Sequence, residues 1–198
     1  MGNEFGMQAT LRRGCGSEEI YTSLAARARE LADACADPAD RLAPLCDALW
    51  SELAPRGLSW IGFYLVAPPS EAEARTADPG VATEMILAAR RDKPACSPIG
   101  LQGVCGQGFL EERIRLVEDV GLLGAGYIAC DPRDRSEIVV PNYRNGAPWG
   151  VLDADSHELA CFGEADVRGL SAVLRSAGLL DRAPEVRADR LHDQQASL

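Results

Sequence analysis

The fold of this chain is decided by residues 136–155, which read SEIVVPNYRNGAPWGVLDAD. Two runs rich in branched residues, Ser136–Pro141 and Trp149–Asp155, flank the dipeptide Asn145-Gly146. Asn-Gly favours a type I′ turn, because both central residues of that turn have positive φ. The stretch therefore predicts a β-hairpin.

The same stretch places three acidic residues together. Side chains at i and i+2 of a strand lie on one face, so Asp153 and Asp155 point the same way, while Leu152 and Ala154 point to the opposite face. Glu137 lies in the partner strand. Neighbouring carboxylates repel, so one of them tends to keep a proton unless a cation is bound. The three acids indicate a pocket for an ammonium group; a solvated sheet face is the alternative.

Outward from this hairpin, the sequence predicts further strands and helices. Three further strands are expected: Leu58–Val66, a second near Met85–Ala88 after a long connection over residues 67–80, and a short one at Arg115–Val120. The expected helices are residues 18–34, a helix after Asp37-Pro38 that contains Pro44, a helical turn at Phe109–Ile114, and Glu164–Ser176. This order predicts a single α+β domain over residues 17–180, with helices beside an antiparallel sheet. Residues 1–16 are expected to form a flexible arm, and the charged residues 181–198 a disordered or partner-docked tail.

Composition narrows the functional classes. The formal net charge of −10 argues against a nucleic-acid-binding protein, because phosphate binding needs clustered Lys and Arg. The sequence has neither the start of a signal peptide nor an apolar run long enough for a membrane span, so we expect a cytoplasmic protein.

Cysteine usage points to redox chemistry. The chain has seven cysteines, at positions 15, 35, 46, 96, 105, 130 and 161. An odd number without a secretion signal argues against a disulfide framework. The absence of a Cys-x-x-Cys pair, with only two histidines, argues against structural zinc, so no metal is expected.

Three of these cysteines, Cys96, Cys105 and Cys130, fall among glycines and prolines in stretches expected to be loops, where functional groups concentrate. Cys46 instead lies on an apolar helical stripe, as a core residue does. A thiolate with a second thiol nearby can be oxidised to a sulfenic acid and then closed to a disulfide. The three loop cysteines therefore predict a redox site; inert thiols are the alternative.

Six motifs carry a family resemblance, in order along roughly residues 40–175. They are Trp60-Ile-Gly-Phe-Tyr64, Lys93-Pro-Ala-Cys96, Gly103-Val-Cys105-Gly106, Ile128-Ala-Cys130-Asp131, Ser136–Pro141 and Gly150–Ser156. Together these segments resemble the free methionine-(R)-sulfoxide reductases, a family built on a GAF domain. The resemblance implies a GAF-like catalytic domain over residues 17–180, with a six-stranded antiparallel sheet flanked by helices, in a homodimer.

The resemblance also implies the roles of the site residues. Cys130 would be the catalytic thiol and Cys96 the resolving one, with Cys105 as a third redox thiol that could resolve instead. The carboxylates that hold the substrate ammonium and assist at the sulfoxide would be Glu137, Asp153 and Asp155. Trp60, with Tyr64 beside it, would form an aromatic wall for the substrate's methyl group.

The implied reaction needs no bound cofactor. Free methionine-(R)-sulfoxide would be reduced to methionine through a cysteine sulfenic acid and an intramolecular disulfide. A thioredoxin-type protein would supply the reducing equivalents by thiol–disulfide exchange.

Two departures from the family pattern bear on the loops expected to cover the pocket. Tyr127 stands where the family usually has His, after Ala125-Gly126 in place of Pro-Gly, and the usual Gly-Pro-Phe is missing before Lys93.

Two other functions compete with catalysis. A GAF-type module that only senses a small molecule has no need of three redox thiols, and a dimeric scaffold would have its cysteines oxidised incidentally.

Overall fold

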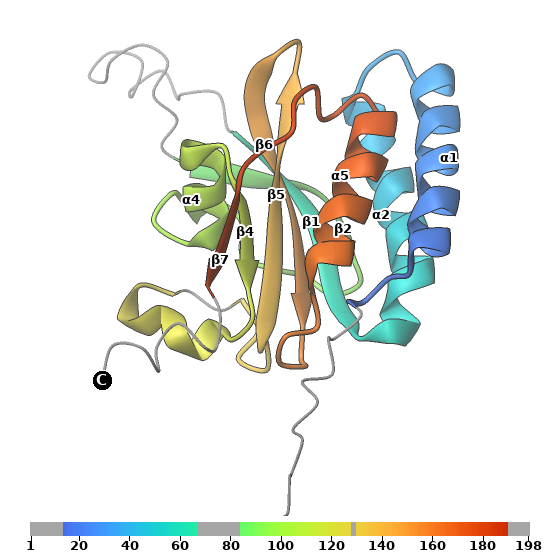
Figure 1. Cartoon of the computed structure of the whole chain (residues 1–198). Helices are drawn as coiled ribbons and strands as arrows, with labels where there is room; N and C mark the ends of the chain where they lie inside the picture. Colours follow the sequence, from blue (N-terminus) through green and yellow to red (C-terminus); the bar gives the residue numbers. More distant parts are fainter. Residues whose placement is uncertain (1–13, 67–83, 128–129, 190–198) are drawn as a thin grey trace, which may run out of the picture.

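The structure is a computed structural model that describes residues 14–66, 84–127 and 130–189. Its elements, drawn in Figure 1, are α1 (Glu18–Ala34), α2 (Ala39–Leu53), η1 (Ala54–Arg56), β1 (Leu58–Val66), β2 (Glu84–Arg91), β3 (Ile99–Gly100), α4 (Val104–Glu111), β4 (Ile114–Val117), η2 (Val120–Gly126), β5 (Ser136–Arg144), β6 (Ala147–Ser156), α5 (Glu164–Ser176) and β7 (Val186–Asp189). The connection between β1 and β2 lies outside the described residues.

The sheet within these ranges has seven strands, in the order β3-β2-β1-β6-β5-β4-β7. The expected six-stranded antiparallel sheet is wrong in two respects, because β7 adds a seventh strand and pairs parallel to β4. Residues 181–198 are charged and include few apolar residues, which is why they were expected to form a disordered or partner-docked tail. Backbone hydrogen bonds form this strand instead, such as Ile114 N to Glu185 O at 2.8 Å. Residues 190–198 lie outside the described part of the chain.

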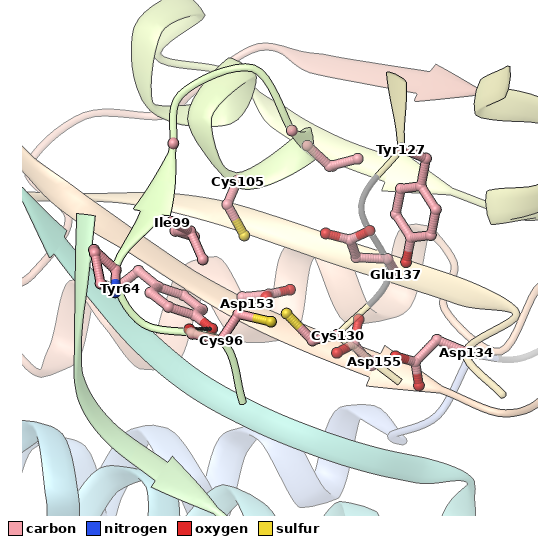
Figure 2. A pocket seen from close by; sticks show the side chains of 14 residues that line it. Tyr64, Cys96, Ile99, Cys105, Tyr127, Cys130, Asp134, Glu137, Asp153 and Asp155 are labelled. Carbon is pink, nitrogen blue, oxygen red and sulfur yellow. Dashed lines mark hydrogen bonds between the residues drawn. The ribbon is translucent and has the colours of Figure 1, made fainter. Parts of the chain in front are cut away.

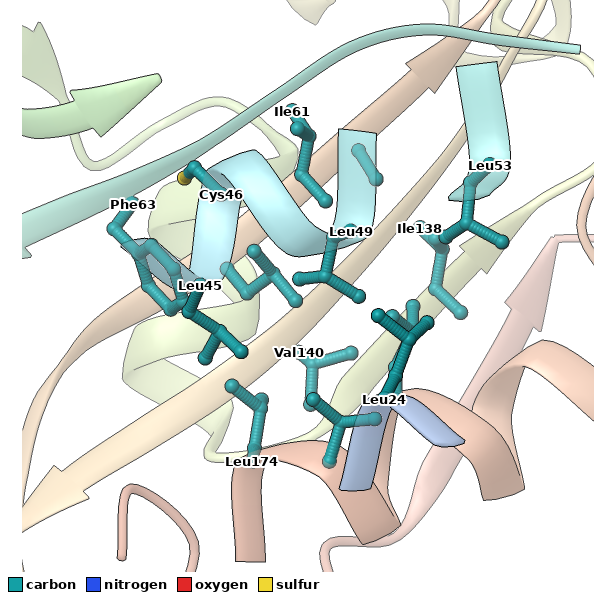
Figure 3. Packing of buried hydrophobic residues seen from close by; sticks show 14 of the residues in the cluster. Leu24, Leu45, Cys46, Leu49, Leu53, Ile61, Phe63, Ile138, Val140 and Leu174 are labelled. Atoms are coloured by element: carbon teal, nitrogen blue, oxygen red, sulfur yellow. The ribbon is translucent and has the colours of Figure 1, made fainter. Parts of the chain in front are cut away.

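The helices α1, α2 and α5 cover one face of the sheet (Figure 1). The main apolar core fills the space between them, and Figure 3 shows part of it: Leu24, Leu45, Cys46, Leu49, Phe63, Ile138, Val140 and Leu174. The core position predicted for Cys46 is confirmed, since this side chain is fully buried. Pro44 lies inside α2 without ending it. The buried Leu45 and Leu49 that follow hold the helix against the sheet.

The opposite face of the sheet carries α4, η2 and the segment before α4, packed around a smaller apolar cluster. The helical turn predicted at Phe109–Ile114 is placed too late, because α4 spans Val104–Glu111. The glycines of this stretch conceal the helix in the sequence. They serve close packing: a Cβ on Gly106 would lie 2.2 Å from the Leu101 backbone.

The hairpin that the sequence predicted is confirmed. Asn145 and Gly146 have φ of 53° and 78°, as a type I′ turn requires, and they join β5 to β6. Both strands extend beyond their predicted limits toward the turn.

The described end of the N-terminal arm, Gly14–Gly16, is attached to the domain rather than free of it. Asp166 of α5 accepts hydrogen bonds from Cys15 N at 3.1 Å and Gly16 N at 2.9 Å. Residues 1–13 lie outside the described residues. Among the helices that the structure describes, none is both long and apolar enough to cross a membrane.

Candidate active site

The three acidic residues predicted from the hairpin lie together on the sheet face opposite the main core. Glu137 on β5 pairs directly with Asp155 on β6, and Asp153 lies two residues along the same strand. Their exposed fractions are only 4%, 8% and 7%. Leu152 and Ala154 point into the main core, as strand alternation requires. The solvated sheet face that was the alternative is therefore wrong.

Burial makes these acids retain protons. It raises the pKa of Asp153 to about 7 and, together with the charge of Asp153, raises the pKa values of Glu137 and Asp155 well above the usual range. One oxygen of Glu137 (Oε2) and one of Asp153 (Oδ1) have no hydrogen-bond partner. Buried charges and polar atoms are costly without partners. The cluster is thus suited to accept a proton or a cation.

A cavity of about 300 Å³ opens over these acids (Figure 2). Its walls come from β1, β5, β6, α4 and the segments before α4 and β5. The lining residues include Tyr64, Cys96, Ile99, Cys105, Tyr127, Cys130, Asp134, Glu137, Asp153 and Asp155. All three acids and all three thiols predicted from the sequence therefore meet in one cavity.

The three thiols do not have equal positions. Cys96 and Cys130 are exposed residues whose sulfur atoms point toward each other, and a hydrogen bond between their side chains affects the pKa of Cys130 (Figure 2). Cys105 is buried in the first turn of α4, so the expectation that it lies in a loop is wrong. Its sulfur lies within 4.8 Å of carboxylate oxygens of Glu137 and Asp153. Cys96 is the thiol that faces Cys130.

Two of the three cavity thiols have raised pKa values and therefore keep their protons when no substrate is bound. Although the Cys130 residue is exposed, its sulfur is partly desolvated by the cavity wall; this raises the pKa of Cys130 to about 12, and the nearby Asp153 adds to the rise. Burial and the charges of Asp153 and Glu137 raise the pKa of Cys105 well above its usual value. A thiolate at Cys130 therefore needs a cation or a proton that neutralises the acids beside it.

The two aromatic residues on β1 line two different cavities. Tyr64 lines the main cavity, while Trp60 lines a smaller hollow beside it, together with Cys130 and Asp155. The Tyr64 hydroxyl donates to Cys96 O at 2.8 Å, and Trp60 Nε1 donates to Lys93 O at 3.0 Å. Both rings thereby fix the segment that carries Cys96, a role that the sequence did not suggest.

An ion-pair cluster that sequence reasoning missed joins the two cysteine-bearing segments. Lys93, three residues before Cys96, forms an ion pair with Asp131, which directly follows Cys130. Arg133 also contacts Asp131, at 2.8 Å. Hydrogen bonds from Arg133 and Lys93 hold the pKa of Asp131 below its usual range. The sequence could have suggested the pairing only through the opposite charges beside the two cysteines.

Asp134 is a second acid that the sequence reasoning did not assign to the site. Asp134 is 6% exposed and lines both cavities. Burial raises the pKa of its carboxyl group. It lies just before β5, outside the alternating pattern that identified Glu137. No periodic signal marks it.

Two groups among the described residues bring possible metal ligands together: Cys105 with Glu137 and Asp153, and Asp131 with Asp134 and His157. In the first group, a metal would have to displace protons from the thiol and the carboxyl groups, because metal ligands must be deprotonated. In the second group, Asp131 is already paired with Lys93 and Arg133.

Known proteins share this architecture. The structure of free methionine-R-sulfoxide reductase from Neisseria meningitidis in complex with its substrate matches with a TM-score of 0.67 and 31% identity, over 82% of this chain and 89% of that chain. Free methionine-R-sulfoxide reductase of Escherichia coli is 33% identical over 115 residues, 57% of this chain and 60% of the relative. GAF domain-containing protein A of Dictyostelium discoideum is 37% identical over 117 residues, 59% and 65%. The matches span less than two thirds of these two curated relatives, and no protein-family model matches the chain.

A GAF domain whose cavity is lined by thiols and carboxyl groups is the class of protein that the fold and the site define. The similarity extends over most of the Neisseria meningitidis enzyme and of a Staphylococcus aureus structure of the same kind. The chain belongs to the family of free methionine-R-sulfoxide reductases.

Proposed function

We propose that this chain reduces free L-methionine-(R)-sulfoxide to L-methionine. The observation that carries the proposal is the placement of two facing thiols, Cys130 and Cys96, beside three buried acids in a cavity of about 300 Å³. A thiol pair supplies the two electrons of the reduction. The acids supply a proton and a binding site for a positively charged group.

Recognition of the free amino acid rests on Glu137, Asp153 and Asp155. A substrate ammonium placed among them neutralises charges that otherwise raise one another's pKa. It also offers donors to the unpartnered oxygens of Glu137 and Asp153. A methionine sulfoxide inside a peptide lacks this ammonium, so the cavity favours the free amino acid.

Substrate binding also prepares the nucleophile. The charge of Asp153 contributes to the raised pKa of Cys130, so its neutralisation by the ammonium favours the thiolate. The thiolate attacks the sulfoxide sulfur and forms an S–S bond, while a protonated carboxyl group donates to the oxygen. The oxygen then moves to the sulfur of Cys130, the S–S bond and the S–O bond of the substrate break, and methionine leaves. Cys130 is left as a sulfenic acid.

The second thiol then completes the reaction. Cys96 attacks the sulfenic sulfur of Cys130, a disulfide forms and water leaves, so that one sulfoxide oxygen and two thiol hydrogens are accounted for. The position of Cys96 opposite Cys130 supports this order, while buried Cys105 remains the alternative resolving thiol. A thioredoxin-type donor restores the dithiol by exchange.

Turnover of isolated substrates tests the proposal. The full chain, supplied with thioredoxin, thioredoxin reductase and NADPH, or with dithiothreitol, should consume the free R epimer and leave the S epimer and the N-acetylated R form largely unreacted. Cys130→Ser should lose this turnover, while Cys35→Ser, which changes a cysteine remote from the cavity, should keep it. No consumption of the R epimer with either reductant would contradict the proposal.

A non-catalytic GAF-type sensor is the second candidate. It is favoured by the similarity to a Burkholderia vietnamiensis structure described as a GAF sensor protein, which is 33% identical over 80% of this chain and 91% of that chain. Calorimetric titration separates the two candidates, because a sensor would bind the free sulfoxide and release it unchanged.

A further inference from the structure

A second pair of cysteines, Cys15 and Cys161, lies outside the cavity just described. Cys15 precedes α1, and Cys161 lies in the connection between β6 and α5. Their exposed fractions are 4% and 9%. The proposed reduction uses neither of them, and they were not assigned a role from the sequence.

Both sulfur atoms lie at the turn where α2 passes through η1 into β1. The Sγ of Cys15 is 3.6 Å from the carbonyl oxygens of Leu53 and Arg56. The Sγ of Cys161 would be only 3.0 Å from a Cβ placed on the adjacent Gly57. A hydrogen bond between the two thiols affects the pKa values of both residues. The two sulfurs are therefore direct neighbours.

The backbone of Cys15 is held in place before any covalent bond forms. Asp166 on α5 accepts hydrogen bonds from Cys15 N, from Gly16 N and, at 2.7 Å, from the Tyr21 hydroxyl. On the other side, Cys161 N donates to the Ser136 hydroxyl at 3.2 Å. Both thiols are thus fixed by backbone contacts from several elements, so little conformational freedom is lost when they are joined.

The two thiols differ in acidity in a way that assigns their chemical roles. The hydrogen bond with Cys15 lowers the pKa of Cys161, while the same hydrogen bond and burial raise the pKa of Cys15. The more acidic thiol of a pair is the one that reacts first with an oxidant. This favours Cys161 as the attacking thiol and Cys15 as the one that closes the bond.

We propose that Cys15 and Cys161 form a second redox site, at which a hydroperoxide produces a disulfide that fastens the N-terminal segment to the β6–α5 connection. The thiolate of Cys161 attacks the peroxide oxygen, which leaves a sulfenic acid on Cys161 and releases water or an alcohol. The thiol of Cys15 then attacks that sulfur, and a second molecule leaves as water. In total, the two thiols lose two electrons, and one hydroperoxide accepts them.

The bond would constrain most of the chain, because the closed loop runs from residue 15 to residue 161. A cross-link over so long a loop stabilises mainly by restricting the unfolded state, and we expect the melting temperature to rise by about 10 °C. The constraint acts on the helical side of the sheet, away from the cavity on the opposite face. Oxidation at this pair should therefore stabilise the domain without consuming the thiols that face the substrate.

Peptide mapping of the full chain tests this site. The reduced protein is treated with dilute hydrogen peroxide, its free thiols are blocked with N-ethylmaleimide under denaturing conditions, and non-reduced peptides are analysed by mass spectrometry. A second sample is equilibrated in glutathione redox buffer, so that slow entry of peroxide does not decide the result. A Cys15–Cys161 peptide is expected in both, with a melting temperature about 10 °C above that of an equally oxidised Cys15→Ser control.

Two outcomes would overturn the proposal. One is that Cys15 and Cys161 remain free thiols in both treatments, or that Cys161 stops as a mixed disulfide with glutathione. The other is a linked pair without any rise in melting temperature, since that bond would have formed outside the native structure. Cys35→Ser, which alters a cysteine of neither pair, should behave as the unchanged protein does.

Discussion

Replacing Asp153 by Asn should make the protein more stable, and by an amount that depends on pH. The pKa of this buried carboxyl is about 7 in the folded protein, against an ordinary value of 3.8 for an aspartate in the unfolded chain. Between these pH values the folded state binds a proton that the unfolded state has released. Stability therefore falls as the pH rises from about 4 to about 7.

The magnitude follows from the difference of about three pH units. Each unit corresponds to about 1.4 kcal/mol, so the ionised carboxylate costs about 4 kcal/mol above pH 7, and less than half of that at pH 5. Asn resembles a neutral carboxyl group in size and is not ionised at either pH. The stability gained by Asp153→Asn should thus be about 3 kcal/mol larger at pH 8 than at pH 5.

Urea denaturation at both pH values measures this difference directly. Asp33→Asn is the matched control, because Asp33 is an exposed acid on α1. Its effect on stability should stay nearly constant over the same interval. An equal effect of Asp153→Asn at pH 5 and pH 8 would refute the conclusion that burial keeps this acid protonated.

The remaining predictions concern the reaction. Mapping after one turnover without reductant should find Cys130 joined to Cys96; a link to Cys105 would transfer the resolving role to that thiol. Asp155→Asn should lower kcat/KM for the free sulfoxide about ten- to a hundredfold, because a charged hydrogen bond in a dry site contributes roughly 1.5–3 kcal/mol; equal losses with the N-acetylated substrate would disprove the ammonium role. Asp131→Asn should slow disulfide closure about tenfold, with little change in methionine release. The slower closure should appear as sulfenic acid that dimedone can trap. Unchanged closure would mean that the ion pair with Lys93 does not align the two thiols.

Much of the site could be predicted from the sequence because local rules determine it. The Asn145-Gly146 turn predicts that β5 pairs with β6, which brings Glu137 near the two aspartates of β6. A register shift between Asn142 and Tyr143, which the sequence does not mark, sets Glu137 directly opposite Asp155. The face on which these acids lie follows from alternation with Leu152. The turn and the alternation are local features of the sequence, and neither needs contacts between distant segments.

What could not be predicted depends on contacts between distant segments. β7 forms through backbone pairing with β4, and its two apolar residues, Val186 and Ala188, are too few to mark a strand in the sequence. The helix α4 is hidden by glycines that allow it to approach Leu101. Cys15 appeared to belong to a free arm because the sequence cannot show that Asp166 binds its backbone.

The parallel pairing of β7 with β4 has an electrostatic consequence for β5, the strand on the other side of β4. Asp189, at the end of β7, lies 2.6 Å from the guanidinium of Arg115, which is 2% exposed and whose charge lowers the pKa of Glu137. Asp189→Asn would remove the carboxylate that balances Arg115. Glu137 would then release its proton more readily, because the charge of Arg115 lowers its pKa. The protonation of the cavity therefore depends on a residue at the edge of the sheet.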